Sequence, residues 1–416
     1  MKKFLLTVFS AGLCTLLNAQ APERCHSHAY HQQQLAQHPE LALQEAEINR
    51  AAEHFANDNP NGFESRAVVT IPVIFHVVYQ NSTENISSTR ILEQLQVLNE
   101  DYRKLNSDHV NVPAAWAGLK ADCEIQFCLA KRTPTNGWTN GIERYSTTTS
   151  SFSLNDDVKF ASSGGANVWD RTKYLNIWVC DLGGGILGYA QFPGGPASTD
   201  GVVLDYRYTG KTGASAPYNK GRTGTHEVGH YFGLYHIWGD DGSSCSGSDQ
   251  VMDTPNQGPE NYGCFNAGQV VTDNCTSTSP GVMWLNYMDY TDDACMYMFT
   301  TGQKTRMWSI LNGSRSSLLT SNACTPVGLD EINLLNSISV YPSPSNGEVT
   351  IDFNGNNAND VDVTVFNAIG QAVLTSRYAV LTDSRIVLDL SGLASGVYAI
   401  EISNGGERTT RKVVIE

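Results

Sequence analysis

The sequence THEVGHYFGLYHIWGD, from Thr225 to Asp240, decides the fold, because it gathers three of the ten histidines of this 416-residue chain. On a helix, His226 and His230 lie four residues apart, so both imidazoles project from the same face about one turn from each other. Two neutral imidazoles at this spacing suit a tetrahedral zinc ion, and a glutamate beside the first can lie next to the metal without binding it. The pattern therefore predicts a zinc site on a helix, with Glu227 as the general base.

A glycine predicts where this helix ends. Gly233 follows His230 by three residues, and glycine takes the left-handed conformation that ends helices, so the chain can turn back and present His236 as a third ligand. Three protein nitrogens leave a fourth position open for water, which is typical of catalytic rather than structural zinc sites. The alternative is a structural or inactive zinc site, but such a site has no use for an unligated carboxylate like that of Glu227.

The longer pattern His-Glu-x-x-His-x-x-Gly-x-x-His resembles the metzincin signature, which also requires a methionine-containing turn beneath the metal. The downstream sequence LNYMDYTDDACM, residues 285–296, supplies Met288 for that turn, and its thioether would form an apolar floor that helps to orient the ligands. Tyr290 is predicted to place its phenol near the metal and to stabilise the oxyanion of a tetrahedral intermediate. Ordinary packing in the core is the alternative for both side chains.

The whole-chain properties predict a secreted protein with more than one folded unit. The chain is longer than one core usually supports, and its net charge of −15 gives no support to a nucleic-acid partner but suits binding of cations such as calcium. The start, MKKFLLTVFSAGLCTLLNAQ, predicts a signal peptide over residues 1–19, because its apolar run is too short to span a bilayer. No later segment is apolar enough for a membrane span, so we expect no transmembrane segment in the mature chain.

Residues 20–66 are polar and helix-prone, and they are predicted to form a removable pro-segment; a flexible linker is the alternative. Cleavage near Ser65 and Arg66 would release the mature enzyme. Of the ten cysteines, Cys14 leaves with the signal peptide, the isolated Cys25 is expected to stay unpaired, and the other eight can pair. Cys25 is a candidate latency switch whose thiolate takes the open zinc position, and a neutral unpaired cysteine is the alternative.

Residues 67–326 are predicted to form an α+β peptidase domain. AVVTIPVIFHVVYQN, residues 67–81, reads as a buried strand, and CEIQFCLAKR, KYLNIWVCDL, GILGYAQFP and DGVVLDYRY as later strands. Between the first strand and the others, an amphipathic helix with Ser88 as a possible N-cap has an apolar face formed by Ile91, Leu92, Leu95, Leu98, Tyr102 and Leu105. A second helix begins near Arg222. This order predicts a mixed twisted sheet with a backing helix and an active-site helix, followed by an irregular C-terminal lobe.

Four segments together resemble the pappalysin family of metzincins, especially its compact bacterial members. They are YLNIWVCDLGGGILGYAQFPGG, HEVGHYFGLYHIWGD, CSGSDQVMDTPNQ and NYMDYTDDACMYMFTTGQKTRM, and the likeness covers roughly residues 68–325. The resemblance implies a two-lobed endopeptidase with one zinc ion in its cleft. It carries these roles to this chain: zinc ligands His226, His230 and His236, general base Glu227, turn methionine Met288 and intermediate-stabilising tyrosine Tyr290.

The same resemblance implies two disulfides and a calcium site in the loop that follows. The disulfides would be Cys245–Cys275 and Cys264–Cys295. The calcium ligands that match best are the carbonyls of Ser248 and Met252 with the side chains of Asp249 and Thr254. These groups supply the hard oxygens that calcium takes, and a solvated acidic turn is the alternative interpretation.

The edge strand GILGYAQF would bind a substrate as an added strand, so that backbone hydrogen bonds give affinity and side pockets give preference. Some relatives carry an acid just before the last loop cysteine, and that acid favours a basic residue after the scissile bond. This chain has Ala294 there, preceded by Asp292 and Asp293. A preference for arginine or lysine is therefore left open.

Short alternating strands separated by turn residues predict a small β-sandwich over residues 335–416. VYPSPSNGEVTI, VFNAIGQAV, LSGLASGVYAIEI and KVVIE in this region resemble the sorting domain read by the type IX secretion system. The resemblance implies export across two membranes, with the secretion machinery as a partner. An immunoglobulin-like accessory domain is the alternative.

The sequence therefore predicts a secreted or surface-attached zinc endopeptidase that acts on protein or peptide substrates. The alternative from a different class is a cell-surface binding or adhesion protein with a structural or inactive zinc site. Retention of Glu227 favours the peptidase.

Overall fold

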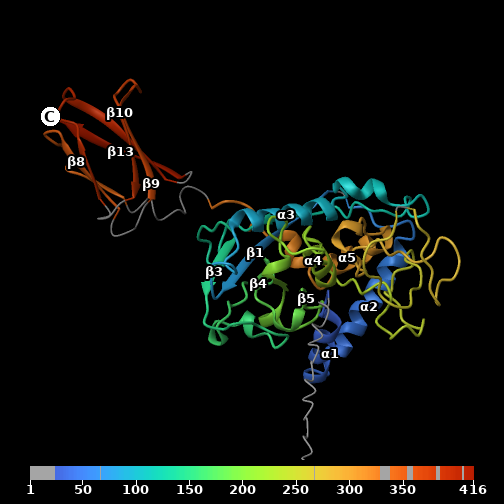
Figure 1. Ribbon diagram of the computed structural model, residues 1–416. Helices are drawn as coiled ribbons and strands as arrows, with labels where there is room; N and C mark the ends of the chain where they lie inside the picture. The colour runs from blue at the N-terminus through green and yellow to red at the C-terminus, as the bar shows by residue number, and fades with distance from the viewer. Residues whose placement is uncertain are drawn as a thin grey trace, which may run out of the picture. The chain divides into compact units, whose positions relative to one another are not determined.

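The computed structural model describes residues 24–65, 67–266, 268–327, 338–353, 359–380, 385–404 and 407–416. The chain divides into two compact units, one formed by the residues up to 129 with 141–322, and the other by 130–140 with 323–416. Figure 1 labels helices and strands of both units. The predicted signal peptide lies outside the described residues.

A mixed six-stranded sheet forms the centre of the first unit. Its strands are β1 (Val69–Tyr79), β2 (Ile125–Leu129), β3 (Ile142–Ser146), β4 (Leu175–Cys180), β5 (Gly188–Ala190) and β6 (Val202–Asp205). They run in the spatial order β2-β1-β4-β6-β5, with β3 also paired to β1. β5 pairs antiparallel with β6, whereas the other pairings are parallel. The short antiparallel strand β5 is therefore an edge of the sheet, where the sequence predicts the substrate-side strand.

Three helices of this unit come from the predicted peptidase segment: α3 (Ser88–Tyr102), α4 (Arg222–Tyr231) and α5 (Thr301–Asn312). α3 packs against β2 and α4, and so backs the active-site helix. Its N-cap is Ser87 and not Ser88, because the Ser87 side chain accepts the hydrogen bond from the first turn. Leu92 and Leu105, which the sequence places on its apolar face, are exposed. Leu92 points about 100° away from its buried neighbour around the helix axis, and Leu105 lies beyond the helix end.

The described part of the predicted pro-segment is helical and packs onto the first unit. It forms α1 (Ser27–Gln37), which contacts β5, and α2 (Leu41–Asp58), which contacts α5; both helices are blue in Figure 1. Asn49 of α2 donates to Tyr235 Oη at 3.0 Å and accepts from Arg306 Nη2 at 2.6 Å. These are the contacts of a docked segment rather than of a flexible linker.

Two free cysteines lie on opposite faces of the sheet. Cys123 belongs to the core cluster on the helix side, and Cys180, at the end of β4, belongs to the cluster on the other side. Both are buried and free, as is Cys25, while Cys128 and Cys324 are disulfide-bonded. The expectation that all eight cysteines other than Cys25 can pair is therefore wrong, because the sheet separates Cys123 from Cys180.

An irregular lobe connects α4 to α5. Its two disulfides are Cys245–Cys275, with Cα atoms 5.3 Å apart, and Cys264–Cys295, with Cα atoms 5.6 Å apart. These are the pairs that the family resemblance implies. Cys264–Cys295 ties the long loop to the segment that carries the methionine turn, and Cys245–Cys275 closes the loop on itself.

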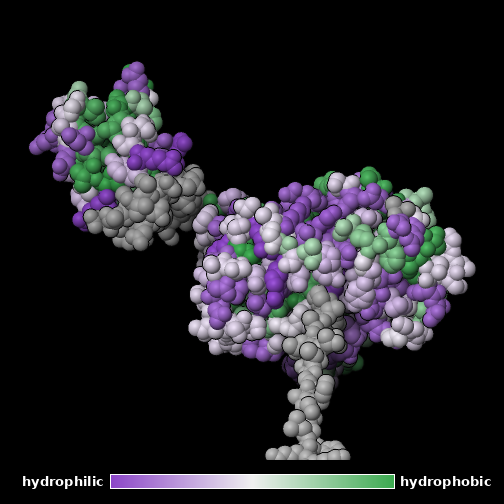
Figure 2. Space-filling model, in the orientation of Figure 1, coloured by the Kyte–Doolittle hydropathy of each residue, from purple (hydrophilic) through white to green (hydrophobic). Residues whose placement is uncertain are grey.

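The second unit is a small β-sandwich of two antiparallel sheets with its own apolar core. One sheet has the order β10-β9-β12-β13 and the other β11-β8-β7. Their bounds are β7 (Ser339–Tyr341), β8 (Glu348–Asp352), β9 (Asn359–Phe366), β10 (Ala372–Val380), β11 (Arg385–Asp389), β12 (Gly396–Asn404) and β13 (Glu407–Ile415). Apolar side chains show on the visible face of this unit (Figure 2). Across the described residues of the whole chain, no helix has the length and apolar character of a membrane span.

Candidate active site

The active-site helix α4 packs closely against the methionine turn at Gly229. A Cβ added at Gly229 would lie 2.5 Å from Met288 Sδ, so glycine allows the buried sulfur to approach the helix this closely. The helix ends at Tyr231, and Gly233 follows with a φ of 83°, a left-handed conformation that glycine adopts without strain. The chain turns back there and returns His236 to the helix.

Three imidazole nitrogens meet at this turn. Nε2 of His226 lies 3.1 Å from Nε2 of His230 and 3.2 Å from Nε2 of His236, and the last two are 3.1 Å apart. Nitrogens that share a tetrahedral zinc ion at about 2.0 Å are roughly 3.3 Å apart. The three rings therefore have nearly the spacing of a zinc-binding set.

The opposite nitrogen of each ring fixes its tautomer. Nδ1 of His226 and Nδ1 of His230 each donate to a backbone carbonyl at 2.7 Å, and Nδ1 of His236 lies 2.8 Å from Asp240 Oδ1. A carbonyl only accepts, so Nδ1 carries the proton, and burial lowers the pKa of His226 and of His230 well below the usual value. Unprotonated Nε2 atoms that face one another repel unless a cation lies between them, so this donor set fits a zinc ion.

Glu227 is fully buried beside these rings. Its Oε2 accepts a hydrogen bond from Ser27 Oγ at 2.7 Å and lies 3.4 Å from Cys25 Sγ, whereas Oε1 has no hydrogen-bond partner among the described residues. Burial raises the pKa of the Glu227 carboxyl to about 8. A carboxyl with one open oxygen and a raised pKa is suited to accept and return a proton near neutral pH.

Tyr290 stands next to the histidines on the methionine turn. Its ring centroid lies 5.7 Å from that of His226 and 5.0 Å from that of His236, and its hydroxyl donates to the Cys25 carbonyl at 2.8 Å. Asp289, which sequence reasoning missed, accepts a hydrogen bond from the Tyr290 amide at 2.8 Å. The carboxylate of Asp289 also binds two side chains of the disulfide loop, so it fixes the turn that presents Tyr290.

The pro-segment places a thiol against the histidines. Cys25 Sγ and one ring nitrogen from each of the three histidines all lie within 4.8 Å of one another. Burial, and after it the negative charge of Glu227, raises the pKa of the Cys25 thiol well above the usual value. The structure thus places the Cys25 thiol beside the three histidines, and a latency role for Cys25 stays a prediction.

The residues after Cys25 run along the free edge of β5. The amide of His26 donates to the Gly188 carbonyl at 3.1 Å, and Ser27 Oγ accepts from the Ala190 amide at 2.8 Å. Ser27 lies in no recognisable sequence motif, so sequence reasoning missed it. Through these contacts the pro-segment occupies the strand edge that faces Glu227.

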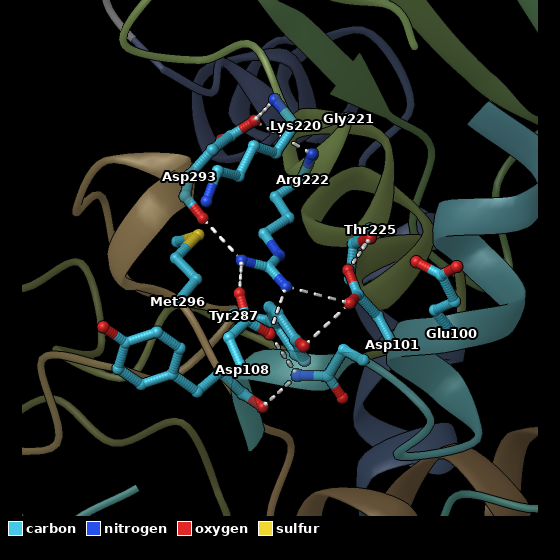
Figure 3. A network of polar contacts seen from close by, with 12 residues as sticks. Glu100, Asp101, Asp108, Lys220, Gly221, Arg222, Thr225, Tyr287, Asp293 and Met296 are labelled. Atoms are coloured by element: carbon cyan, nitrogen blue, oxygen red, sulfur yellow. Dashed lines mark hydrogen bonds and ion pairs between the residues drawn. The ribbon is translucent and has the colours of Figure 1, made fainter. Parts of the chain in front are cut away.

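An acidic pocket on the other side of Cys25 holds Arg24. Arg24 Nη2 lies 2.8 Å from Asp293 Oδ1, and neither side chain is exposed. The other carboxylate oxygen of Asp293 accepts from the backbone amides of Lys220 and Arg222 at the start of α4, at 2.8 and 3.1 Å (Figure 3). Asp293, one residue before Ala294, therefore places a buried carboxylate in this pocket.

The Arg222 side chain connects Asp293 to acidic residues on and after α3. Its guanidinium donates to the Asp293 carbonyl at 2.6 Å and to the Asp108 carboxylate at 2.7 and 2.8 Å, and it lies 3.4 Å from Asp101 Oδ1 (Figure 3). Asp101 also accepts from Tyr287 Oη at 2.9 Å. One buried network thus connects the backing helix, the active-site helix and the methionine turn.

The candidate calcium residues lie in the disulfide loop. Thr254 Oγ1 donates to Asp249 Oδ2 at 2.7 Å, and burial raises the pKa of the Asp249 carboxyl to about 7. Ser248 Oγ accepts from the Gln250 amide at 2.9 Å, and the Met252 side chain is exposed. The structure brings Asp249 and Thr254 together, and a calcium role for the four residues stays a prediction.

Both units match known protein families. The family model of pregnancy-associated plasma protein-A matches residues 160–312, and the model of the secretion system C-terminal sorting domain matches residues 339–416. An extracellular metalloprotease of Colletotrichum graminicola is 32% identical over 292 residues, which are 67% of this chain and 89% of the relative.

Solved structures also match the first unit. The mature mirolysin of Tannerella forsythia in complex with a cleaved peptide is 53% identical, with a TM-score of 0.60, and the match covers 61% of this chain and 97% of that protein. A mutant promirolysin of the same organism is 45% identical, with a TM-score of 0.66, and that match covers 73% of this chain and 99% of the promirolysin chain.

Proposed function

We propose, from the premise that the chain belongs to the pregnancy-associated plasma protein-A (pappalysin) family of secreted metalloendopeptidases, that its three converging histidines hold one catalytic zinc ion. The observation that carries this proposal is the triangle of unprotonated Nε2 atoms, 3.1–3.2 Å apart, beside the open oxygen of Glu227. The alternative of an adhesion protein with a structural zinc site gives no role to that oxygen.

The side chains around the site have separate roles in the proposed hydrolysis of a peptide bond. A zinc ion held by His226, His230 and His236 would supply Lewis-acid chemistry for the scissile carbonyl and the attacking water. The Glu227 carboxylate accepts a proton from the attacking water and returns it to the leaving amine. Tyr290 Oη donates to the substrate carbonyl oxygen as negative charge develops there, as it now donates to the Cys25 carbonyl at 2.8 Å. Asp289 keeps Tyr290 in that position.

The cleft supports a substrate polypeptide in extended form. The edge of β5 offers backbone groups to an added strand, and the His26–Gly188 hydrogen bond of 3.1 Å supports this proposal. The buried Asp293 offers its charge to a basic side chain next to the scissile bond, because it holds Arg24 in the same way. Proteins with accessible arginine or lysine are therefore the proposed substrates.

The pro-segment keeps the enzyme latent by occupying three functional groups at once. Arg24 fills the pocket of Asp293, Cys25 faces the three histidines, and Ser27 binds Glu227. A thiolate is the form in which cysteine ligates a metal, so Cys25 would take the position that a substrate needs. Replacing Cys25 by alanine in the full chain is expected to raise peptidase activity before processing, and unchanged latency would exclude this role.

The chain organisation follows from these assignments. We propose a signal peptide over residues 1–19, a pro-segment over 20–66 cut near Ser65 and Arg66, a peptidase domain over 67–326 and a sorting domain over 335–416 that engages the secretion machinery. One structural calcium ion at Ser248, Asp249, Met252 and Thr254 would pin the disulfide loop.

Cleavage of gelatin by the processed protein tests the peptidase. Removal of one general base typically lowers the rate about 10²–10⁴-fold, so Glu227→Gln should lose activity on this scale. Separately, a chelator should abolish activity until zinc is restored. Glu100→Gln, at a partly exposed position of α3, is the matched control and should keep the parent rate. If Glu227→Gln and the chelator both leave the rate unchanged, the peptidase function is wrong.

A further inference from the structure

One side chain of the pro-segment lies on the far face of the edge strand. Gly188 of β5 faces the active-site helix, since a Cβ added there would lie 3.0 Å from Glu227 Cγ. Successive residues of a strand point to opposite faces, and Tyr189 accordingly joins the core cluster on the other side of the sheet. Tyr30 of α1 is buried in the same cluster, with its ring centroid 4.8 Å from that of Tyr189. The pro-segment therefore wraps around β5 and fills a second pocket.

The closed end of this pocket is ionic. Tyr30 Oη lies 2.8 and 2.9 Å from the two carboxylate oxygens of Asp156 and 3.1 Å from Lys159 Nζ. Lys159 is fully buried, and its ammonium also lies 2.7 Å from Asp156 Oδ1 and 2.8 Å from the Thr199 carbonyl. The phenol hydroxyl of Tyr30 therefore donates to the Asp156 carboxylate and accepts from the Lys159 ammonium.

The walls of the pocket are aromatic. Lys159 Nζ lies 4.9 Å from the ring centroid of Tyr189 and 5.7 Å from that of Trp178, and it lies 4.7 Å from the ring centroid of Tyr30, which occupies the pocket. The Tyr189 hydroxyl is buried and has no hydrogen-bond partner among the described residues. Aromatic walls with convergent polar groups at one end are the make-up of a binding pocket that selects for a hydroxyl-bearing ring.

Removal of the pro-segment takes Tyr30 away and leaves this pocket beside the cleft. Tyr189, Lys159, Asp156 and Trp178 all come from residues beyond the proposed cleavage point. An aliphatic side chain would leave the buried ammonium and carboxylate without the hydrogen bonds that the phenol provides, and a site built in this way rejects analogues that lack the hydroxyl.

The position of the pocket relative to the scissile bond follows from the chain path. Arg24 precedes Cys25 and Tyr30 follows it, so the chain passes from the Asp293 pocket, past the three histidines, to the pocket of Tyr30. From Cys25 the chain advances by two residues to Ser27 and then by three residues of α1 to Tyr30, a path of about 11 Å. An extended substrate covers that distance with roughly three residues.

We propose that in the processed enzyme this pocket is a substrate subsite that accepts a tyrosine side chain, roughly three residues from the scissile bond and on the side away from Asp293. The inference rests on the proposed peptidase function, and it adds a second specificity determinant to the cleft. Its ligand is the phenol of a polypeptide substrate.

A peptide series tests the subsite. Each peptide carries arginine directly after the scissile bond and one tyrosine, phenylalanine or alanine at a position two to five residues before it. At one position, kcat/KM should be about tenfold higher for tyrosine than for phenylalanine, and higher for phenylalanine than for alanine. A tyrosine-to-phenylalanine ratio near one at every position would overturn the proposal.

Two additions separate this inference from the peptidase function itself. The same peptides are titrated calorimetrically against processed Glu227→Ala protein, so that tyrosine preference is measured as Kd even if no peptide is cleaved. Failure of cleavage with a retained Kd preference would then reject the peptidase function but keep the subsite. Equal Kd values for the tyrosine and phenylalanine peptides would reject the subsite.

A substitution at the ionic end locates the preference. Asp156 has a φ of 66°, a conformation that asparagine tolerates, so Asp156→Asn should keep the backbone while weakening the acceptor for the phenol. The tyrosine-to-phenylalanine ratio should fall toward one in Asp156→Asn and stay at the parent value in Asp157→Asn, the matched control on the same turn. A ratio that both variants leave unchanged would show that the hydroxyl is not bound here.

Discussion

Replacing Asp293 by asparagine tests whether the buried acid that holds Arg24 also selects basic substrate residues. Its Oδ1 receives Arg24 Nη2 at 2.8 Å, and neither side chain is exposed. Its Oδ2 receives the amides of Lys220 and Arg222 at the start of α4. The substitution keeps the size of the side chain and one carbonyl oxygen, but it removes the charge that a basic side chain would meet.

The magnitude follows from the burial of this pair. Leaving one charge of a buried ion pair without its partner costs about 3–5 kcal/mol. Because asparagine keeps one acceptor, we take the lower end, and about 3 kcal/mol corresponds to roughly a hundredfold in rate. We therefore expect kcat/KM to fall about a hundredfold for a peptide with arginine after the scissile bond, and far less for one with leucine there.

The assay compares two peptides that differ only in this arginine or leucine, cleaved by the processed parent, Asp293→Asn and the neighbouring control Asp292→Asn. Damage to α4 lowers both rates and leaves their ratio unchanged, so the ratio isolates the effect of the charge. The reasoning is refuted if the arginine-to-leucine ratio of Asp293→Asn stays within about threefold of the parent value, or if Asp292→Asn changes the ratio equally.

Three further predictions concern the support of the site and of the sheet. Asp240→Asn alters the group that orients the third histidine, so zinc affinity, measured by chelator competition, should fall about 10–100-fold; an unchanged affinity would contradict this. Burial lowers the pKa of His76 to about 4. Its contribution to the free energy of unfolding is therefore present above pH 6.5 and is lost as the pH falls toward 4, because the unfolded chain then binds the proton. This loss should be about 3 kcal/mol, and the pH dependence of urea unfolding should lack it in His76→Phe. Gly233→Ala places a Cβ 2.8 Å from Ile310 Cγ1 at a positive φ and should lower the free energy of unfolding by about 2 kcal/mol or more. The control Gly242→Ala has a positive φ but no atom within 4 Å of the added Cβ, and it should lower this free energy by about 1 kcal/mol. Equal losses of stability in thermal unfolding would exclude the contact with Ile310.

The zinc motif could be predicted because its chemistry is local. A spacing of four on one helix fixes His226 and His230 on the same face, and Gly233 marks the turn that returns His236. The family, the mixed sheet with its two helices and the C-terminal sandwich are confirmed by the structure and by the matching families. Each of these features leaves a short pattern in the sequence.

The occupants of the cleft could not be predicted because their contacts are not local. Ser27 meets Glu227 across 200 residues of sequence, and Arg24 meets Asp293 across 269. Asp293 itself was visible in the sequence, but its role depends on where the carboxylate points and not on its distance from the last loop cysteine. The face of a side chain was also misjudged at Leu92, where apolar character suggested the core.

The proposed function assigns both latency and substrate preference to Asp293. The carboxylate that receives Arg24 in the full chain is the group that we propose to receive a basic substrate residue after processing, and both would gain the same charge-assisted hydrogen bond. A substitution that weakens arginine preference must therefore also weaken the hold of the pro-segment. Asp293→Asn should accordingly raise the activity of the unprocessed chain toward leucine peptides while it lowers the activity of the processed enzyme toward arginine peptides. Opposite changes in the two forms would distinguish a shared pocket from general damage to the fold, which lowers both activities.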